Sequence, residues 1–552
     1  MALGVIFRDR TFLVGAAGIA GWCAVAGWSE RSLPGAASTG VGFACLGVGA
    51  VLALVFLAAS ARFDPRNVEE RAPKALPRGI AFLIFAFGLA VNLFRLDQQL
   101  SFDEIWTWDA QVRRPLGVSI WTYASDNNHP LYSLMAWTTT HVIADDRWSL
   151  RLPAALFGAG NVLLTAQLGS RATSRREGAL AGAVLALAYH HVFFSQNARG
   201  YTALLFFTLL STLALFSALD GGGRRARLLH GTALALGLYV HLTAVFVVVA
   251  QALLYLGWAI PRRKEPRRAL EPLEGFLWSG VLAFLLYAPM LEPLVEFFRT
   301  SSSRAGYFQE KPTWKSPLWT LRAAAESFGH GVWVGSLAMI AAAGVILTGM
   351  ISYFRRDRRL PILLVLAGAV ATVLLLALNR NLWPRFYFFL GGFGVLLLVR
   401  GVLAIVDAAS NFLRPNSLIL VRTLRTAAFA AVFAVELTMT RSAWFDEKQD
   451  FDGAVAWIEK EGLRPSTVTC ALTTFVYRFY YGEHFLAAVE TPGELEDRLR
   501  RDGSVHVLLI SPNHLASWSP ELWKRISSGR EVARFPGTTG RDQDVVVVEI
   551  ER

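Results

Sequence analysis

The stretch YTALLFFTLLSTLALFSALDGGGRRAR, residues 201–227, decides the fold class. Its apolar part, 201–219, has about the 20 residues that a helix needs to cross roughly 30 Å of hydrocarbon. A glycine-rich turn and an arginine cluster follow, which is typical of a short loop on the cytoplasmic side of a membrane. The pattern predicts a spanning helix that ends inside the cell.

Similar apolar runs recur along most of the 552 residues, of which 54% are hydrophobic and only 17% charged. They fall at about 11–28, 41–61, 79–95, 150–169, 178–196, 201–219, 229–241, 243–259, 275–291, 331–351, 360–378, 386–406 and 421–439. The sequence therefore predicts a polytopic α-helical membrane protein with about 13 transmembrane helices. Two of the runs, 229–241 and 243–259, are short and predict a broken pair that meets at GLYVHLTA.

Basic residues in the short loops predict the topology, because cytoplasmic loops are rich in Lys and Arg. The clusters are Arg171, Arg175 and Arg176; Arg224, Arg225 and Arg227; Arg262, Arg263, Lys264, Arg267 and Arg268; and Arg355, Arg356, Arg358 and Arg359. Placing all four inside puts the N-terminus in the cytoplasm and the loops 96–149 and 292–330 outside the plasma (inner) membrane. The segment 129–144 must then lie along the outer interface with the Trp-rich segment 102–112, as interfacial helices.

The composition changes near residue 441, where charged residues become frequent. Strands are predicted at 466–473, 504–511 and 544–551, with helices at 452–462 and 492–503 between them. We therefore expect two additional N-terminal transmembrane helices in 1–78, the main transmembrane domain in 79–440, and a small extracytoplasmic α/β domain in 441–552. Its sheet should be largely parallel.

The sequence lacks the features that are typical of several other classes of protein. The net charge of +12 is spread over loops between apolar runs, which argues for membrane topology and against nucleic-acid binding. The three cysteines, Cys23, Cys45 and Cys470, form no disulfide framework. The chain has no Walker loop, no dinucleotide fingerprint, no HExxH and no CxxC pair, which argues against nucleotide-driven transport.

An acidic pair, Asp103 and Glu104, directly follows a predicted span and is flanked by Trp106 and Trp108. One interpretation is structural, because Ser101 and a Glu three residues later have the spacing of a helix capping box. The other is functional, because a charge at membrane depth is costly and usually serves a purpose. The position at the end of a span favours a functional site.

Six stretches in order resemble the C-type glycosyltransferase superfamily over roughly residues 79–405. LFRLDQQLSFDEIWT is similar to the acidic motif of its first outer loop, and HPLYSLMAW and SLRLPAALFG are similar to segments of the family-39-like polyprenyl-phosphate-sugar transferases. SQNARGYTALLFF, GLYVHLTAVFVV and WPRFYFFLG resemble later segments of the same family. Protein mannosyltransferases and lipid A aminoarabinose transferases are its relatives.

The resemblance implies an inverting transferase that moves one sugar, a hexose or a pentose, from a polyprenyl-phosphate donor to an acceptor hydroxyl at the outer membrane face. The acceptor would be a glycolipid, a polysaccharide or a protein. Asp103 takes the general-base position of the family, and a carboxylate in a dry pocket suits that role. Glu104 would orient the acceptor or hold a cation.

The leaving lipid phosphate gains negative charge and needs cations or donors near it. Arg385, at the outer start of a helix, is the first candidate; the alternative is an arginine that anchors the helix at the headgroups. Arg199 and Tyr201, where one helix ends and the next begins, would also bind the donor phosphate or sugar. His129 would contact the donor phosphate or simply start a helix before Pro130, and His241 would contact phosphate or satisfy backbone groups of the broken pair.

The outer loop 297–319 mixes aromatic and basic residues, and we expect Tyr307, Lys311 and Trp314 to contact the acceptor, unless the loop is only a flexible connection. The aminoarabinose transferases carry an Asp shortly after the arginine that Arg199 matches, but this chain has Gly200 and Tyr201. The sequence thus requires no cofactor and gives only weak support for a divalent cation. A polymerase or ligase of lipid-linked oligosaccharides, and a lipid or solute transporter, are the competing functions.

Overall fold

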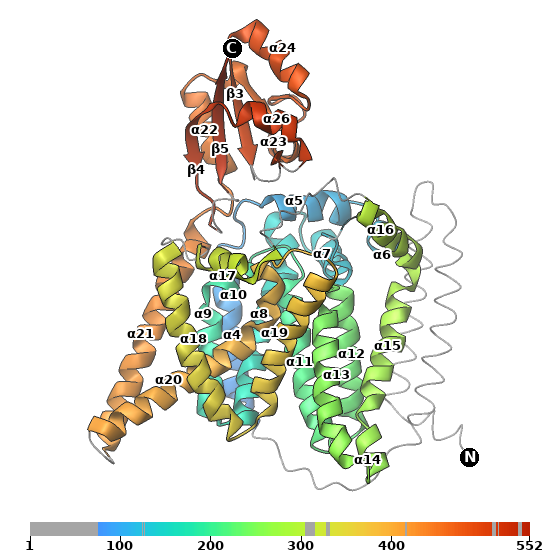
Figure 1. Cartoon of the computed structure of the whole chain (residues 1–552), viewed down its shortest axis with the longest axis vertical. Coiled ribbons are helices and arrows are strands. Elements are labelled where there is room, and N and C mark those ends of the chain that lie inside the picture. Colours follow the sequence, from blue (N-terminus) through green and yellow to red (C-terminus); the bar gives the residue numbers. More distant parts are fainter. Residues whose placement is uncertain are drawn as a thin grey trace.

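The computed structural model describes residues 75–123, 125, 127–303, 315–326, 332–413, 417–510, 515–516, 518–538 and 544–552. Figure 1 shows a bundle of long helices with a separate α/β domain at one end. The helices of the bundle and its outer loops are α4 (Arg78–Leu93), α5 (Phe102–Thr107), η2 (Trp108–Val112), α6 (Leu116–Trp121), α7 (Pro130–Val142), α8 (Arg147–Ala172), α9 (Arg175–Leu187), α10 (Tyr189–Ser195), α11 (Tyr201–Leu219), α12 (Arg224–Val240), α13 (Ala244–Ala259), η3 (Ile260–Arg262), α14 (Pro266–Leu270), α15 (Leu273–Tyr287), η4 (Ala288–Met290), α16 (Leu291–Ser303), α17 (Pro317–Glu326), α18 (Val332–Phe354), α19 (Arg359–Ala377), η6 (Pro384–Leu390), α20 (Gly391–Leu413) and α21 (Leu418–Phe445).

Within the described residues, eight helices are long and apolar enough to cross a membrane, or nine if the bent pair α9 and α10 is one span. That pair bends by 64°. Each apolar run predicted from residue 79 onward lies mainly in a helix, whereas 11–28 and 41–61 fall outside the described residues. The chain is thus a multi-pass helical protein, and the total of 13 helices stays a prediction.

The broken pair predicted at GLYVHLTA is confirmed. Helix α12 ends at Val240, His241 is extended with φ −158°, and α13 begins at Ala244. Helix α12 starts at Arg224, earlier than the apolar run at 229 indicated, because its first turn is formed by the basic cluster itself. The break places His241 beside the ends of other helices.

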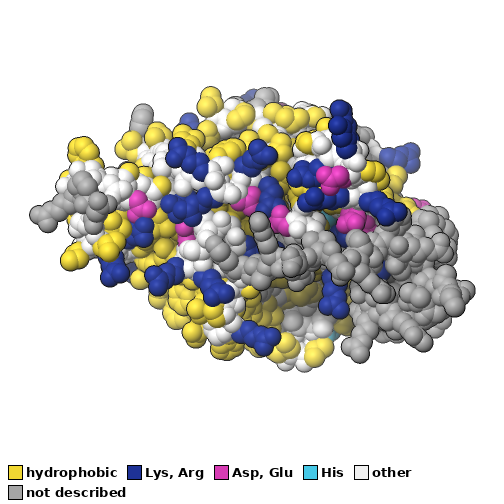
Figure 2. All heavy atoms as spheres, turned by 90° about the horizontal axis from the view of Figure 1, so that it is seen from below, with side chains coloured by type: hydrophobic (Ala, Val, Ile, Leu, Met, Phe, Trp, Pro, Cys, Tyr) yellow, Lys and Arg dark blue, Asp and Glu magenta, His cyan; other side chains and the backbone are white. Residues whose placement is uncertain are grey.

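The four basic loops meet at one end of the bundle. Arg359 donates to Asp220 at 2.6 Å, and Arg227 donates to Glu274 at 2.6 Å, so the loops after α11, α13 and α18 are linked by ion pairs. Arg171 adds the loop after α8 through a hydrogen bond to the Leu213 carbonyl oxygen at 3.4 Å. Figure 2 views this end, opposite the α/β domain, and Lys and Arg side chains gather there.

Short helices form a layer between the bundle and the α/β domain (Figure 1). In this layer α5, η2, α6 and α7 follow α4, and α7, predicted to lie along the interface, is not among the candidate spans. One apolar core joins the layer to the domain. It contains Ile105, Trp108, Val112 and Tyr132 from the layer, Leu150 from α8, and Phe451, Val455, Tyr477 and Leu508 from the domain. The layer and the domain are therefore packed together.

The C-terminal domain holds a five-stranded sheet in the order β2-β1-β3-β5-β4. Its elements are α22 (Phe451–Lys460), η7 (Arg464–Ser466), β1 (Thr467–Thr469), α23 (Leu472–Tyr481), β2 (Ala487–Ala488), α24 (Pro492–Asp502), β3 (Ser504–Ile510), α26 (Pro520–Ile526), β4 (Arg530–Phe535) and β5 (Val545–Glu551). Strand β1 is parallel to β2 and β3, but β5 is antiparallel to β3 and β4. The prediction of a largely parallel sheet is wrong for half of the pairs.

The reason for the mixed sheet is the last connection. Strand β4 is followed by β5 after only the segment 536–544, which is too short for the helical crossover that parallel neighbours require. The predicted strand 466–473 is also shorter than expected, because β1 ends at Thr469 and α23 begins at Leu472. Successive residues of β3, such as Leu508 and Leu509, belong to two different cores, so both faces of the sheet are covered.

Candidate active site

Asp103 lies in the first turn of α5, and its side chain is 37% exposed. Its Oδ2 is 3.4 Å from Nη1 of Arg199 and 3.8 Å from Nη1 of Arg385. These arginines come from the α10–α11 connection and from η6, so three segments far apart in the sequence meet here. The carboxylate faces two guanidinium groups and remains accessible.

Arg199 is almost buried, with 4% of the residue exposed. Its Nε donates to Nε2 of His129 at 3.0 Å, and its guanidinium lies 5.8 Å from the ring centre of Tyr201. The imidazole and the phenol ring are themselves in contact, with centroids 5.7 Å apart. A buried hydrogen bond and an aromatic ring thus fix the direction of the guanidinium.

His129 precedes α7, and its protonation state follows from its contacts. Because Nε2 accepts the bond from Arg199, Nδ1 carries the proton and donates to the Val240 carbonyl oxygen at 3.3 Å. Burial lowers the pKa of His129 well below its ordinary value, and the positive charge of Arg199 lowers it further. The imidazole is therefore neutral at physiological pH.

His241 and Arg385 complete the group. The His241 ring lies 4.6 Å from the His129 ring and 5.4 Å from Tyr201, centre to centre, and its Nδ1 accepts from the Thr243 N–H at 3.2 Å. Arg385, 40% exposed, stacks over Trp383 at 5.1 Å. We call the converged residues the Asp103 cluster: Asp103, His129, Arg199, Tyr201, His241 and Arg385.

Glu104 has a different environment from its neighbour, because it is fully buried. Its Oε1 accepts from Arg151 Nε at 2.6 Å and from the Ala198 N–H at 2.8 Å, and its Oε2 accepts from Arg151 Nη2 at 2.8 Å and from Lys448 Nζ at 3.1 Å. The N–H and the hydroxyl of Ser101 also donate to Oε2, both at 3.0 Å. The capping interpretation thus holds for Glu104, whose oxygens leave no open side for an acceptor or a cation.

We call Glu104, Arg151 and Lys448 the Glu104 clamp. Burial by itself raises the pKa of Glu104, but the charges of Arg151 and Lys448, with hydrogen bonds from Arg151 and Ser101, lower it below its ordinary value. Arg151, also fully buried, donates in addition to the carbonyl oxygens of Leu96, Gln98 and Gln99 at 2.8–3.0 Å. The clamp therefore holds the backbone that leads into α5.

Two clamp residues had no predicted role. Arg151 lies in SLRLPAALFG, where the Arg-Leu-Pro signal was noted only as a helix start. Lys448 lies in DEKQD, which looks like a solvated charge run. The predicted acceptor residues Tyr307, Lys311 and Trp314 lie outside the described residues. In the described part of the chain, no three His, Cys, Asp or Glu side chains are arranged to hold a metal ion.

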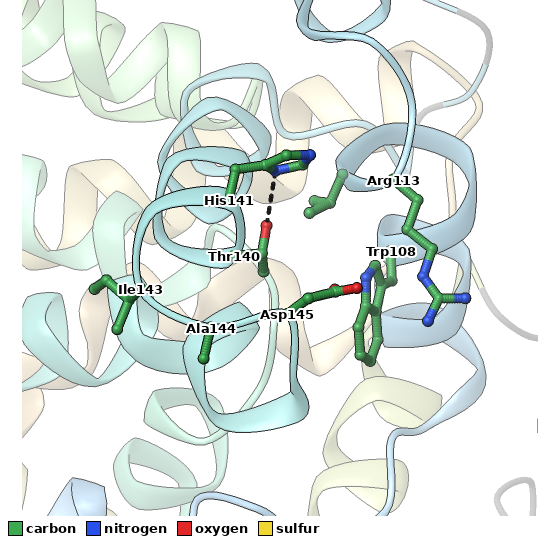
Figure 3. Close-up of a pocket in the computed structure, with 8 residues that line it drawn as sticks. Trp108, Arg113, Thr140, His141, Ile143, Ala144 and Asp145 are labelled. Carbon is green, nitrogen blue, oxygen red and sulfur yellow. Dashed lines mark hydrogen bonds between the residues drawn. The ribbon is translucent and has the colours of Figure 1, made fainter.

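A pocket of about 560 Å³ lies beside the same layer (Figure 3). Trp108 and Arg113 line it from the η2 side, and His141 and Asp145 line it from the end of α7 and the loop before α8. Arg113 stacks over Trp108 at 4.5 Å. No member of the Asp103 cluster is among its lining residues, so it is a separate hollow.

Residues 127–291 match the family model described as dolichyl-phosphate-mannose-protein mannosyltransferase. No curated protein matches the chain. The matched segment contains four of the six cluster residues: His129, Arg199, Tyr201 and His241.

Solved structures of similar arrangement include ArnT from Cupriavidus metallidurans in the apo state, 14% identical over 85% of this chain and 98% of that chain, with a TM-score of 0.47. Arabinosyltransferase EmbB from Mycobacterium smegmatis is 14% identical over 72% of this chain and 44% of that chain, with a TM-score of 0.47. The Archaeoglobus fulgidus oligosaccharyltransferase is 12% identical over 88% and 73%, with a TM-score of 0.44. The family match confirms the predicted resemblance for residues 127–291, a segment that is similar to the dolichyl-phosphate-mannose-protein mannosyltransferases.

Proposed function

We propose that the protein is an inverting glycosyltransferase that moves one sugar from a polyprenyl-phosphate donor to an acceptor hydroxyl at the outer face of the membrane. The observation that carries the proposal is an accessible carboxylate, Asp103, held 3.4 Å from Arg199 and 3.8 Å from Arg385. A base beside two cations suits a reaction that removes a proton from one oxygen while negative charge develops on another. The family match supports a lipid-phosphate donor, because the matching family is described by dolichyl-phosphate-mannose.

The proposed step forms one bond to the anomeric carbon, breaks another and moves one proton. The acceptor oxygen attacks the anomeric carbon and passes its proton to Asp103, while the bond from that carbon to the phosphate oxygen breaks and the lipid phosphate leaves with the electron pair. Arg199 and Arg385 bind the phosphate and stabilise its growing charge. The bound phosphate shares these guanidinium groups with Asp103, which weakens the ion pairs of the carboxylate and lets it accept the proton.

The other cluster residues position these groups. Neutral His129 accepts from Arg199 Nε, which leaves the terminal nitrogens of that guanidinium for Asp103 and the phosphate. His241 and Tyr201 pack against His129 and so hold the imidazole that orients Arg199. Glu104, predicted to contact the acceptor, acts instead through the backbone of α5, because its oxygens are occupied.

The proposed orientation follows from the two ends of the bundle. The basic loops lie at the end opposite the α/β domain, and the Asp103 cluster includes α5, which lies beneath that domain (Figure 1). With the basic end in the cytoplasm, the cluster and the domain 441–552 face outward from the inner membrane. A sugar presented there on a lipid carrier would be transferred to a glycolipid, a polysaccharide or a protein.

The test compares Asp103→Asn with a matched control, Asp109→Asn, whose side chain is 38% exposed on the same segment and contacts only Arg114 among the charged residues described. Purified wild type and both variants are incubated with radiolabelled polyprenyl-phosphate sugars and extracted envelope acceptors. Asp103→Asn should lose transfer by about 10²- to 10⁴-fold, whereas Asp109→Asn should transfer like wild type.

Near-normal transfer by Asp103→Asn would refute the assignment of the base. Donor binding by wild type without any release of sugar, in the presence of acceptor, would favour the transporter alternative. Release of a whole oligosaccharide from its lipid would favour the polymerase or ligase alternative.

A further inference from the structure

Lys448 lies in the connection between α21, which ends at Phe445, and α22, which begins at Phe451. Only 5% of the residue is exposed. Its Nζ donates to Oε2 of Glu104 at 3.1 Å and to the carbonyl oxygen of Gln196. One buried ammonium therefore joins the start of the α/β domain to two segments of the bundle.

Those two segments are the ones that carry the site. Glu104 directly follows the proposed general base in α5, and Gln196 belongs to the connection that carries Arg199. The Ala198 N–H, next to Arg199, already donates to Oε1 of Glu104 at 2.8 Å. Lys448 thus bonds both to α5, which carries the proposed base, and to the α10–α11 connection, which carries Arg199.

Other groups of the domain contact the same segment. The Gln449 amide oxygen accepts from the Phe102 N–H at 2.8 Å, and the Tyr480 hydroxyl accepts from the Leu100 N–H at 2.7 Å and donates to its carbonyl oxygen at 3.0 Å. The Phe475 ring of α23 packs at 6.1 Å from Phe102. The domain, and not the bundle alone, fixes the backbone around the start of α5.

Lys448 is not needed to neutralise the carboxylate, because Arg151 already pairs with Glu104 through two hydrogen bonds. Burial lowers the pKa of Lys448 to about 7, with the charge of Arg151 adding to the effect and Glu104 opposing it. A second buried cation costs desolvation energy that a well-packed apolar side chain would avoid. Stability alone does not explain why a lysine is here.

We infer that Lys448 is a positioning residue through which the docked C-terminal domain holds Asp103 in register with Arg199. The inference deepens the proposed function and rests on it. Because a displacement of about 1 Å in a catalytic group can slow a reaction about 100-fold, loosening this junction should affect the chemical step more than donor binding.

The test uses the full-length protein with Lys448→Met, the conservative variant Lys448→Arg, and the control Lys460→Met, which removes an exposed lysine from α22. Transfer is measured with radiolabelled polyprenyl-phosphate mannose, or with whichever sugar of the donor panel wild type releases. For Lys448→Met we expect kcat to fall about 10- to 100-fold, the donor KM to change less than about twofold, and the melting temperature to stay equal or rise. Lys448→Arg should regain most of kcat, and Lys460→Met should behave like wild type.

Hydrogen–deuterium exchange gives a readout that needs no activity. In Lys448→Met, amides of 99–112 and 195–200 should exchange faster than in wild type, with no such change in Lys460→Met. Wild-type kcat and exchange in Lys448→Met would overturn the inference. So would a fall in kcat that only parallels a lower melting temperature and is not rescued by Lys448→Arg. If wild type releases no sugar from any donor, the proposed function fails, and exchange alone decides whether the domain is coupled.

Discussion

Asp103 and Glu104 are adjacent in the sequence and opposite in environment. Successive residues of a helix point about 100° apart, so one carboxylate of α5 faces the accessible cluster while the next turns into the protein. Asp103 is 37% exposed and lies between two arginines at 3.4 and 3.8 Å. Glu104 is fully buried and bonds to Arg151, whose Nε lies 2.6 Å away.

The difference separates a group that can change its partner from one that cannot. Asp103 has loose ionic contacts and solvent access, so a substrate can approach it and exchange contacts with its arginines. Glu104 has short hydrogen bonds on both oxygens, and removing Arg151, which donates to both of them, would leave a buried charge with too little compensation. A carboxylate thus suits a reaction at position 103, whereas the carboxylate at position 104 stabilises the fold.

The largest expected effect comes from Glu104→Gln, which leaves Arg151 and Lys448 buried without a counter-charge. Breaking a buried ion pair on one side typically costs about 3–5 kcal/mol of folding free energy. We expect a large drop in the melting temperature and loss of transfer, whereas Asp103→Asn should lose transfer at an unchanged melting temperature. Thermal unfolding of the two purified variants, followed side by side, measures the contrast.

The double variant Glu104→Gln with Lys448→Met is the control, since it removes one of the stranded cations and should recover part of the stability.

The stability contributed by Glu104 should also depend on pH in a defined direction. Because the pKa of Glu104 is lowered on folding, its contribution to stability is complete above its ordinary pKa of 4.5 and is lost as the pH falls below it. The difference in folding stability between wild type and Glu104→Gln should therefore become smaller as the pH falls. A difference that grows would contradict the stabilising role of the Glu104 clamp.

The contrast between the two carboxylates was only half visible in the sequence. The position of the pair after a span, and the ordered motifs, led to six residues that the structure brings together from five segments. The spacing of Ser101 and Glu104 predicted their capping box, but not that Glu104 is buried. Its link to Lys448, 344 residues away, depends on how the α/β domain docks, and no local pattern reports that.

The C-terminal sheet shows the same limit. The apolar runs of β3 and β5 identified two strands, but β4 reads REVARF, an edge strand whose exposed charges hide its pairing. Because strand direction depends on which neighbours pair, the antiparallel half of the sheet could not be read from composition. Apolar periodicity predicts elements well and their long-range pairing poorly.

An intermediate effect on transfer is expected from Arg385→Gln, which alters the accessible Asp103 cluster and leaves the buried Glu104 clamp unchanged. Removing one group that stabilises charge developing in a transition state typically costs about 10²- to 10³-fold in kcat. Arg385→Lys keeps the charge but loses the forked geometry, and we expect it to retain more activity than Arg385→Gln. Steady-state transfer with the wild-type donor checks both variants. If Arg385 only anchored its helix at the headgroups, the lysine variant would be as active as wild type and the glutamine variant only slightly impaired.

The smallest expected effect is that of Tyr201→Phe, which separates ring packing from hydrogen bonding inside the Asp103 cluster. The Tyr201 ring, 3% exposed, packs against both His129 and His241 with centroids at 5.7 and 5.4 Å, and phenylalanine preserves that packing. Only a hydroxyl bond to the donor would be lost, which is worth about 0.5–1.5 kcal/mol, or at most roughly tenfold in kcat/KM. Tyr201→Ala, in contrast, should release His129 and with it the guanidinium of Arg199. Equal losses in the two variants would show that the hydroxyl, and not the ring, is what the cluster needs.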